Sequence, residues 1–301
     1  MTATHTPPLI SFIARKGGVG KSTCATLISR IYAENGLRVV VADCDPQGTT
    51  TESLLASARA EHVSTFGTRL CSGESIADLP EPTSHDERIS IVPASEALTL
   101  HAAELDRDAL GVIKVQQTLA SLSEVEADVV VIDTPGNYGV LTFGALAASR
   151  WAVVTTFCQK PSAREVPKAL DVVREARKAN PNLELLGVIA NNLDSRARHE
   201  LRVLATMRKA LSYRLVEPPV PRATAITAAM DPGGALDRRN KGIRSMAQVS
   251  EELLRRHLAG VRQPSTPSDG PPAGLCAARV AVTEVVAVDT VGEVETKEQA
   301  A

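Results

Sequence analysis

The chain has 301 residues, a formal net charge of -2, 44% hydrophobic residues and 23% charged residues, which is typical of a globular protein with a sizeable core. One Trp, three Tyr and four Phe are too few aromatic rings for a protein that stacks the bases of single-stranded nucleic acid. The sequence has no apolar run of about 18 residues, no export signal and no metal-ligand spacing among its five cysteines, so we expect a cytoplasmic protein with reduced thiols.

Short apolar runs alternate with helical patterns along the chain. Buried strands are predicted at residues 9–14, 37–42, 89–92, 128–132, 151–156 and 185–190. Helices are predicted at 22–35, 96–122, 139–149, 162–179, 196–212 and 243–259, with Gly36 ending the first. This alternation predicts an α/β fold with a mostly parallel, twisted sheet flanked by helices on both faces. Residues 58–88 are less regular, and we expect loops and short helices there.

The predicted helices and strands end near residue 261, which we take as the end of a single domain, residues 1–261. Residues 263–274 contain four Pro and no large apolar residue, which is typical of a linker. We expect residues 262–301 to form this Pro-rich linker and an acidic, disordered tail. The Val-rich stretch at 279–291 could instead form a strand or bind a partner.

The charge is unevenly distributed along the chain. Residues 195–256 contain 13 Lys and Arg against 6 Asp and Glu, a local net charge of +7. Such a segment can be a set of solvated helix faces or a surface that contacts a nucleic-acid backbone. The charge pattern alone leaves both interpretations open.

A glycine-rich string, Lys-Gly-Gly-Val-Gly-Lys-Ser-Thr at residues 16–23, lies between a predicted strand and a predicted helix. In this context the glycines let backbone N–H groups face a phosphate, and the helix N-terminus adds partial positive charge. Lys21 can reach the β and γ phosphates, and the Ser22 hydroxyl can bind Mg²⁺. The predicted nucleotide contacts in this loop are Gly17, Gly18, Val19, Gly20, Lys21, Ser22 and Thr23.

The loop departs from the usual phosphate-loop pattern at its start, because Arg15 stands where that pattern has glycine. Lys16 adds a second ammonium group at the mouth of the loop. It could reach the phosphates of a facing subunit, as an arginine finger does, or it could be an ordinary surface lysine. The surrounding string favours the first interpretation.

Carboxylates follow two of the predicted strands. Asp43 and Asp45 belong to the string Asp-Cys-Asp-Pro-Gln-Gly after the second strand, and Asp133 ends the strand at 128–132. Ligands of open α/β sheets lie at the carboxyl ends of the strands. We therefore expect one of the first two carboxylates to hold a metal-bound water and the other to orient the attacking water. Asp133 has the position of a Walker B carboxylate beside the metal.

Two further features follow predicted strands. Gly136, in the string Asp-Thr-Pro-Gly, could offer its N–H to the γ phosphate and so sense hydrolysis. Asn191 and Asn192 end the strand at 185–190, where a side-chain amide could contact adenine. The alternative for the asparagines is an ordinary strand-end turn.

The strings at residues 16–23, 43–50 and 128–136 resemble those of the ParA/MinD group of deviant-Walker P-loop ATPases, most closely the ParA-type partition proteins. The resemblance covers about residues 8–260. It implies an enzyme that hydrolyses ATP with Mg²⁺, slowly without a partner, as a dimer that encloses the nucleotides. The implied roles are catalysis by Lys16, Lys21, Asp45 and Asp133, metal binding by Ser22, Asp45 and Asp133, and adenine contact by Asn191.

The resemblance also implies partners. The ATP dimer of such proteins binds double-stranded DNA nonspecifically, which places them on the nucleoid in the cytoplasm, and a ParB-type centromere-binding protein stimulates hydrolysis. The implied DNA contacts in this chain are Arg196, Arg198 and Arg222. They lie in the segment of net charge +7.

Other functions remain possible on the same fold. A MinD-like membrane-cycling ATPase would need a basic amphipathic C-terminal helix, whereas the tail here is acidic. A metal-cluster ATPase would need paired cysteines, and Cys24 and Cys44 are more simply packing residues. A small-molecule kinase would need an acceptor site, which the sequence does not indicate. A weakly hydrolysing, nucleotide-dependent scaffold is the remaining alternative, although the charged residues of the loops favour hydrolysis.

Overall fold

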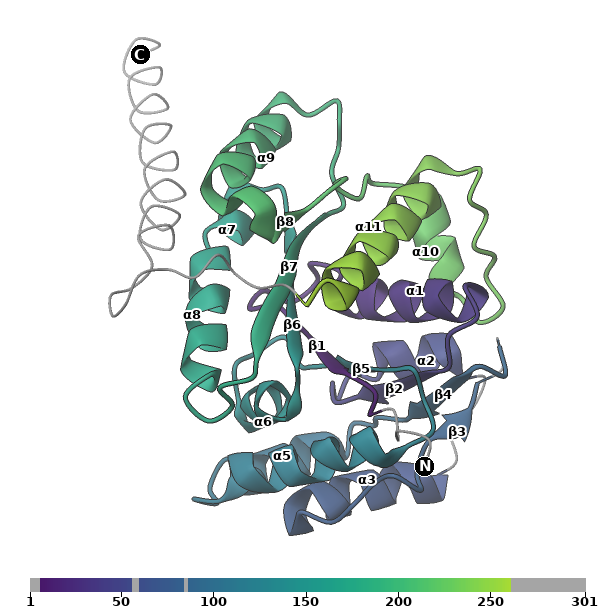
Figure 1. The fold of residues 1–301 in the computed structure, drawn as a ribbon, viewed down its shortest axis with the longest axis vertical. Coiled ribbons are helices and arrows are strands. Elements are labelled where there is room, and N and C mark those ends of the chain that lie inside the picture. The colour runs from purple at the N-terminus through teal and green to yellow at the C-terminus, as the bar shows by residue number, and fades with distance from the viewer. Residues whose placement is uncertain (1–5, 56–59, 84–85, 261–301) are drawn as a thin grey trace, which may run out of the picture.

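The structure is a computed structural model that describes residues 6–55, 60–83 and 86–260. Its strands form one sheet in the order β3-β4-β2-β5-β1-β6-β7-β8 (Figure 1). They are β1 (Leu9–Ile13), β2 (Val39–Asp43), β3 (Glu81–Pro82), β4 (Ile89–Val92), β5 (Val129–Asp133), β6 (Trp151–Phe157), β7 (Glu184–Asn191) and β8 (Leu215–Val216). Within the described residues every strand pair is parallel except β3–β4. The predicted fold class is confirmed.

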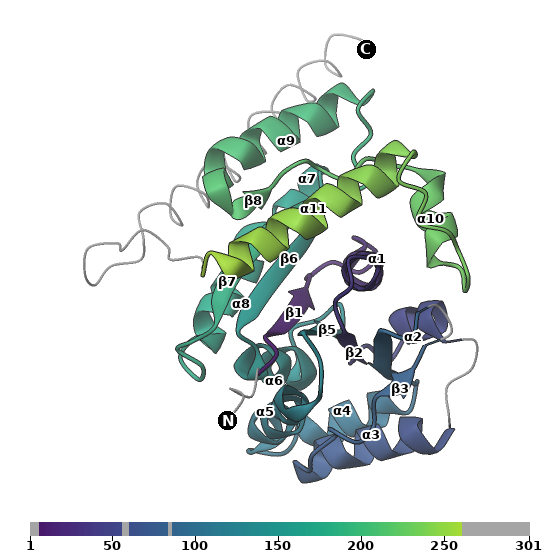
Figure 2. The same cartoon turned by 45° about the vertical axis from the view of Figure 1, so that its right-hand side comes forward.

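Helices cover both faces of this sheet. The first are α1 (Lys21–Glu34), α2 (Thr49–Leu54), α3 (Ala60–Ser72), α4 (Leu98–Leu105), α5 (Gly111–Ala120) and α6 (Val140–Ala148). The later ones are α7 (Lys160–Ala163), α8 (Val166–Ala176), α9 (Arg198–Leu211), α10 (Thr224–Met230) and α11 (Lys241–Leu258). Short 3₁₀ turns follow α5 at Ser121–Glu124 and α9 at Ser212–Arg214. Two views agree that α1, α10 and α11 lie on one face and α3, α5, α6 and α8 on the other (Figures 1 and 2).

The side chains along a strand alternate between two hydrophobic cores, one on each face of the sheet. In β2, Val39 and Val41 pack in the core beneath α1 and α11, whereas Val40 and Ala42 pack in the core beneath α3 and α5. Successive side chains of a strand point to opposite faces of the sheet, and both faces of this sheet are buried. This explains why apolar residues predominate at both inward and outward positions of strands such as β2 and β5.

The predicted strands all exist, with ends that shift by one or two residues. The predicted helix at 96–122 is wrong in its middle, because the chain turns between α4 and α5. A Cβ on Gly111 would lie 2.1 Å from the backbone oxygen of Leu105, so glycine permits this close return of the chain. The predicted helix at 162–179 is likewise divided into α7 and α8. Gly36 follows α1 with a φ of 90°, in the left-handed region, which fits its predicted role as the residue that ends this helix.

The sheet brings the ends of three strands together. Phe12 of β1 and Asp43 of β2 both stand opposite Asp133 of β5 in the strand register. The loops that follow β1, β2 and β5 therefore meet at one edge of the sheet.

The predicted linker and tail at 262–301 lie outside the described residues. None of the helices in the described part of the chain has the length and hydrophobicity of a membrane span.

Candidate active site

The phosphate loop connects β1 to α1. Gly18 and Gly20 have φ angles of 75° and 80°, in the left-handed region that favours glycine. A Cβ on Gly20 would lie 2.0 Å from Nδ2 of Asn191, so close packing requires glycine there as well. No side chain caps the N-terminus of α1, which leaves its N–H groups to bind a phosphate. The loop thus has the backbone geometry that phosphate binding requires, and its individual contacts stay predictions.

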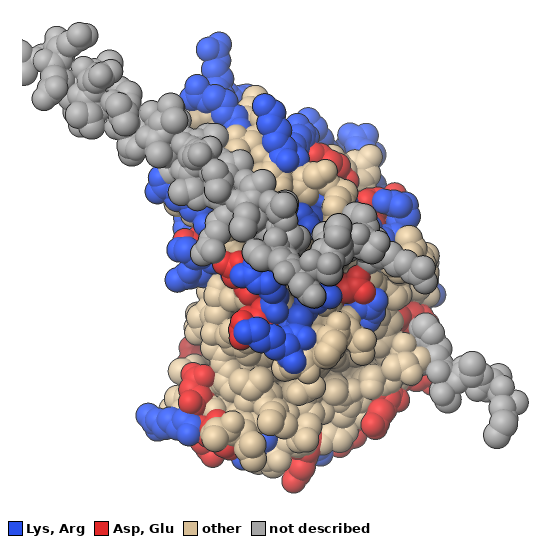
Figure 3. Space-filling view, turned by 60° about the vertical axis from the view of Figure 1, so that its left-hand side comes forward, with Lys and Arg blue, Asp and Glu red and all other residues tan. Residues whose placement is uncertain are grey.

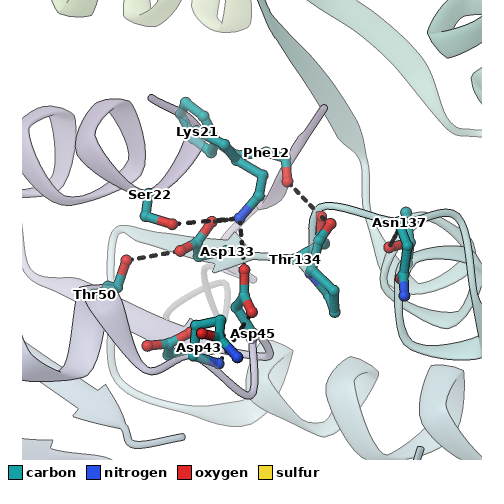
Figure 4. A network of polar contacts seen from close by, with 12 residues as sticks. Phe12, Lys21, Ser22, Asp43, Asp45, Thr50, Asp133, Thr134 and Asn137 are labelled. Atoms are coloured by element: carbon teal, nitrogen blue, oxygen red, sulfur yellow. Dashed lines mark hydrogen bonds and ion pairs between the residues drawn. The ribbon is translucent and has the colours of Figure 1, made fainter. Parts of the chain in front are cut away.

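Lys21 lies at the centre of a buried polar network (Figure 4). Its Nζ is 2.6 Å from Oδ1 of Asp133, 3.5 Å from Oδ2 of Asp45 and 3.4 Å from Oγ of Ser22. Burial by itself would lower the pKa of Lys21, but Asp133, Asp45 and Asp43 together raise it above its usual range. The structure thereby brings together the lysine, serine and carboxylates that the sequence predicts for this site.

Asp133 is oriented from its other side by a threonine. Thr50, fully buried, donates from Oγ1 to Oδ2 of Asp133 at 2.8 Å (Figure 4). Thr26 of α1 donates to Oγ1 of Thr50 at 3.2 Å. Thr50 is a site residue without a predicted role, and its only signal in the sequence is its place in the string at 43–50. Its hydroxyl fixes the direction of the Walker B carboxylate.

Asp43 and Asp45 have different environments. Oδ2 of Asp43 accepts hydrogen bonds from the backbone N–H and the hydroxyl of Thr51, both at 2.8 Å, and Oδ1 accepts from the N–H of Asp45 at 3.1 Å. Burial, together with the charge of Asp133, raises the pKa of Asp43 well above its usual range. Asp43 therefore holds the loop in shape, whereas the carboxylate of Asp45, which lies 3.5 Å from Nζ of Lys21, is 16% exposed and accessible to a ligand.

The loop after β5 lies against the phosphate loop. A Cβ on Gly136 would be 3.6 Å from Cα of Gly17. The Thr134 hydroxyl donates to the carbonyl oxygen of Phe12 at 2.7 Å, which joins the loop to the end of β1 (Figure 4). A cavity of about 400 Å³ opens beside these loops, between Asp45, Gly136 and α4.

A second cavity, of about 450 Å³, lies on the other side of the phosphate loop. Its walls include Gly20, Thr23, Phe157, Asn191 and Pro221, a mixture of apolar and amide groups suited to a nucleoside. Nδ2 of Asn191 donates to the carbonyl oxygen of Val19 at 3.2 Å, and Oδ1 accepts from the next backbone N–H at 2.9 Å. Asn191 therefore lines this second cavity and also fastens β7 to the phosphate loop, and its contact with adenine stays a prediction.

The second lysine of the loop has the opposite environment to the first. Lys16 is exposed at the start of the loop, whereas Lys21 is 6% exposed. Neighbouring Arg15 forms an ion pair with Glu165, with Nε and Oε2 3.2 Å apart. Lys16 thus has the accessibility that a contact with a second subunit requires.

The predicted DNA contacts lie before α9, at the start of α9 and on the wall of the second cavity. Arg196 is 92% exposed in the segment before α9, and Arg198 is exposed at the start of α9. Arg222 lines the cavity itself and is half-exposed. Figure 3 shows Lys and Arg side chains concentrated on the part of the molecule that carries α9. Arg196, Arg198 and Arg222 are therefore accessible to a ligand, and their contact with DNA stays a prediction.

The chemistry of the site fits a magnesium nucleotide. Hydroxyl and carboxylate oxygens, which Mg²⁺ prefers, come from Ser22, Asp45 and Asp133. Among the described residues no group of three or more His, Cys, Asp and Glu side chains forms a metal cluster by itself. A metal here would accordingly be shared between the protein, water and phosphate oxygens, as is usual in P-loop sites.

Known proteins resemble the chain over most of its length. The sporulation initiation inhibitor protein Soj of Bacillus subtilis is 26% identical over 249 residues, which cover 81% of this chain and 97% of the relative. The chromosome partitioning protein ParA of Myxococcus xanthus is 27% identical, with coverage of 82% and 88%. A solved structure named cobyrinic acid a,c-diamide synthase, from Mycobacterium smegmatis with bound ATP analog and magnesium, has a TM-score of 0.70 at 28% identity, covering 86% of this chain and 99% of that one.

The fold and the site define an ATPase of the deviant-Walker P-loop class. A family model described as an AAA domain matches residues 8–185, more than half of the chain. The chain belongs to this family and is a ParA-type ATPase, as the strings at residues 16–23, 43–50 and 128–136 predict. Its similarity to Soj and ParA assigns it to the partition or positioning ATPases.

Proposed function

We propose that this protein is an ATP-driven DNA partition protein. Its ATP-bound dimer binds double-stranded DNA without sequence preference, and a ParB-type partner stimulates hydrolysis and releases the dimer. The observation that carries the proposal is the contrast between two lysines of one loop. Lys21 is buried among carboxylates, and Lys16 is exposed beside it.

The nucleotide is Mg²⁺-ATP. Its phosphates bind residues 17–23, Lys21 contacts the β and γ phosphates, and Ser22 and the carboxylates Asp45 and Asp133 surround the metal. The metal neutralises phosphate charge, and Asp45 orients the attacking water. The nucleoside occupies the cavity of about 450 Å³ beside Asn191.

Dimerisation follows from the exposed lysine. A second ammonium group at the γ phosphate stabilises the charge that develops in phosphoryl transfer. Since Lys16 is exposed in its own subunit, it is available to the nucleotide of a facing subunit. ATP is then both the substrate and the ligand that stabilises the dimer.

DNA binding uses the basic surface. Arg196 and Arg198 are exposed, and Arg222 lines the nucleoside cavity. A dimer presents this surface twice, so its affinity for DNA exceeds that of a monomer and decreases steeply with salt. Such binding places the protein on the nucleoid in the cytoplasm.

The test is binding to nonspecific duplex DNA over a series of salt concentrations, with ATP, ADP and no nucleotide, and with light scattering to count subunits. We expect ATP to produce a dimer and DNA binding together. A protein that stays monomeric with a non-hydrolysable ATP analogue and Mg²⁺ would refute the proposed cycle. Binding to anionic vesicles in place of DNA would favour a membrane-cycling ATPase instead.

A further inference from the structure

Arg222 lies near two acidic side chains, Asp194 in the segment before α9 and Glu200 in the first turn of α9. Its Nη2 is 3.6 Å from Oε1 of Glu200, and its Nη1 is 3.9 Å from Oδ2 of Asp194. Its Nε donates to Oδ1 of Asn192 at 3.3 Å. In this conformation the charge of Arg222 is shared with two carboxylates, although 51% of the side chain is exposed.

Glu200 is firmly held in this arrangement. It is 2% exposed, its Oε2 accepts from the backbone N–H of Asp194 at 2.7 Å, and its Oε1 accepts from Nε2 of Gln159 at 3.1 Å. Asp194 in turn accepts from the backbone N–H of Arg196 at 2.9 Å and lies 3.5 Å from its Nε. The two carboxylates therefore contact two of the three predicted DNA contacts.

The same arginine borders the nucleoside cavity. Asn192, Pro221 and Arg222 all line it. The N–H of Arg222 donates to the carbonyl oxygen of Leu193 at 2.8 Å, which ties the strand end to the segment before α10. Asn192 has a φ of 54°, in the left-handed region. A nucleoside in the cavity would touch the residues that hold Arg222 against its acidic neighbours.

Resting on the proposed function, we propose that Asp194 and Glu200 form an acidic clamp that competes with DNA phosphates for Arg222 and Arg196, and that ATP in the nucleoside cavity opens it. A guanidinium group binds a carboxylate or a phosphate with the same N–H groups, so the two partners exclude each other. The carboxylates belong to the same chain and are always present at high effective concentration. DNA therefore gains Arg222 only when the clamp opens.

The experiment compares wild type, Glu200→Gln and Asp194→Asn in binding to nonspecific duplex DNA, without nucleotide and with a non-hydrolysable ATP analogue. Both variants should bind DNA about tenfold more tightly without nucleotide, equivalent to about 1.4 kcal/mol, and within about twofold of wild type with the analogue. The ratio of the DNA affinity with the analogue to the DNA affinity without nucleotide should therefore be smaller in the variants than in wild type. Nucleotide affinity, measured by calorimetry, should be unchanged.

Glu217→Gln is the matched control. Glu217 pairs with Arg208 of α9, with Nε and Oε1 2.7 Å apart, and is not among the residues that line the nucleoside cavity. Removal of its charge changes the general electrostatic attraction of DNA, so the affinity should rise by a similar factor in both nucleotide states and leave the ratio unchanged.

Two outcomes separate the clamp from the proposed function. An affinity ratio equal to that of wild type in the folded variants would overturn the clamp while leaving nucleotide-gated DNA binding intact. Wild-type protein that binds DNA in neither state would instead overturn the proposed function, and the clamp with it. If Glu200→Gln does not fold, Asp194→Asn decides, because its side chain is partly exposed.

Discussion

The ammonium group of Lys21 and the carboxylate of Asp133 form a buried ion pair at 2.6 Å, with Lys21 on the first turn of α1 and Asp133 at the end of β5. The pair joins the phosphate loop to the Walker B strand. Each member has a second partner, Asp45 for the lysine and Thr50 for the aspartate. A phosphate that enters the loop would compete with these carboxylates for Lys21.

Lys21→Ala should weaken ATP binding by about a hundredfold, because it removes a charge-assisted contact to the phosphates. It should also lower the free energy of unfolding by about 3 kcal/mol, since Asp133 and Asp43 stay buried without their cation. Calorimetric titration and urea denaturation measure the two effects. An unchanged nucleotide affinity in the folded variant would contradict the assigned role.

Lys16→Ala should bind ATP with nearly normal affinity and keep normal stability, because Lys16 is exposed. Dimerisation with ATP and hydrolysis should both fall, the latter by at least about a hundredfold. Light scattering and phosphate release are the measurements. Wild-type turnover by this variant would rule out a role across the dimer interface.

Asp45→Ala should bind ATP but hydrolyse it slowly, since the carboxylate that we propose to orient the attacking water is lost. The ATP dimer should then persist, which is visible as prolonged retention on DNA after free nucleotide is removed. Asp43 cannot substitute, because its carboxylate is fully buried and engaged by three hydrogen bonds. Rapid dissociation of the variant from DNA would argue against this role.

Thr50→Val should reduce kcat about tenfold and raise the Mg²⁺ concentration needed for activity, with little change in volume at the site. The hydroxyl that orients Asp133 is lost, and one buried carboxylate oxygen is left without its donor, at a cost of about 1–2 kcal/mol in stability. Thr26→Val is the control, because Thr26 contacts Thr50 but does not donate to Asp133. Equal effects of the two substitutions would indicate a packing role only.

Glu252→Gln tests how α11 is held. Hydrogen bonds from Arg255 and Arg256 lower the pKa of Glu252 to about 2, below its usual value of 4.5. A depressed carboxyl pKa stabilises the folded state above pH 4.5, and this contribution is lost as the pH falls toward 2. With screening by solvent, the substitution should cost about 1 kcal/mol at pH 7. The difference from wild type, measured by urea denaturation, should shrink below pH 4.5.

Glu175→Gln serves as the comparison for that experiment. Glu175 pairs with Lys178 on an exposed helix face, and both side chains are more than half exposed. Its removal should change stability little at any pH. A loss of stability at Glu252 that does not vary with pH would show that packing, rather than charge, holds this end of α11.

Local sequence determines the sheet and the phosphate loop. Continuous β-branched runs such as residues 129–132 can be satisfied only where both faces are buried, and Gly18 and Gly20 permit a loop that other residues would strain. Because the carboxyl ends of parallel strands converge, the positions of Lys21, Asp45 and Asp133 in the sequence are enough to predict that they meet.

Contacts between distant segments decide the rest. Thr50 orients Asp133 across 83 residues, Gly20 packs against Asn191, and Arg222, which follows β8, contacts Glu200 of α9. The strands β3 and β8 have two residues each, which is too short to show a hydrophobic periodicity in the sequence. The turn before Gly111 lets α5 pack against α6. Such features depend on which surfaces the completed sheet presents, and hydrophobic periodicity along one segment carries no information about side chains that approach it from another.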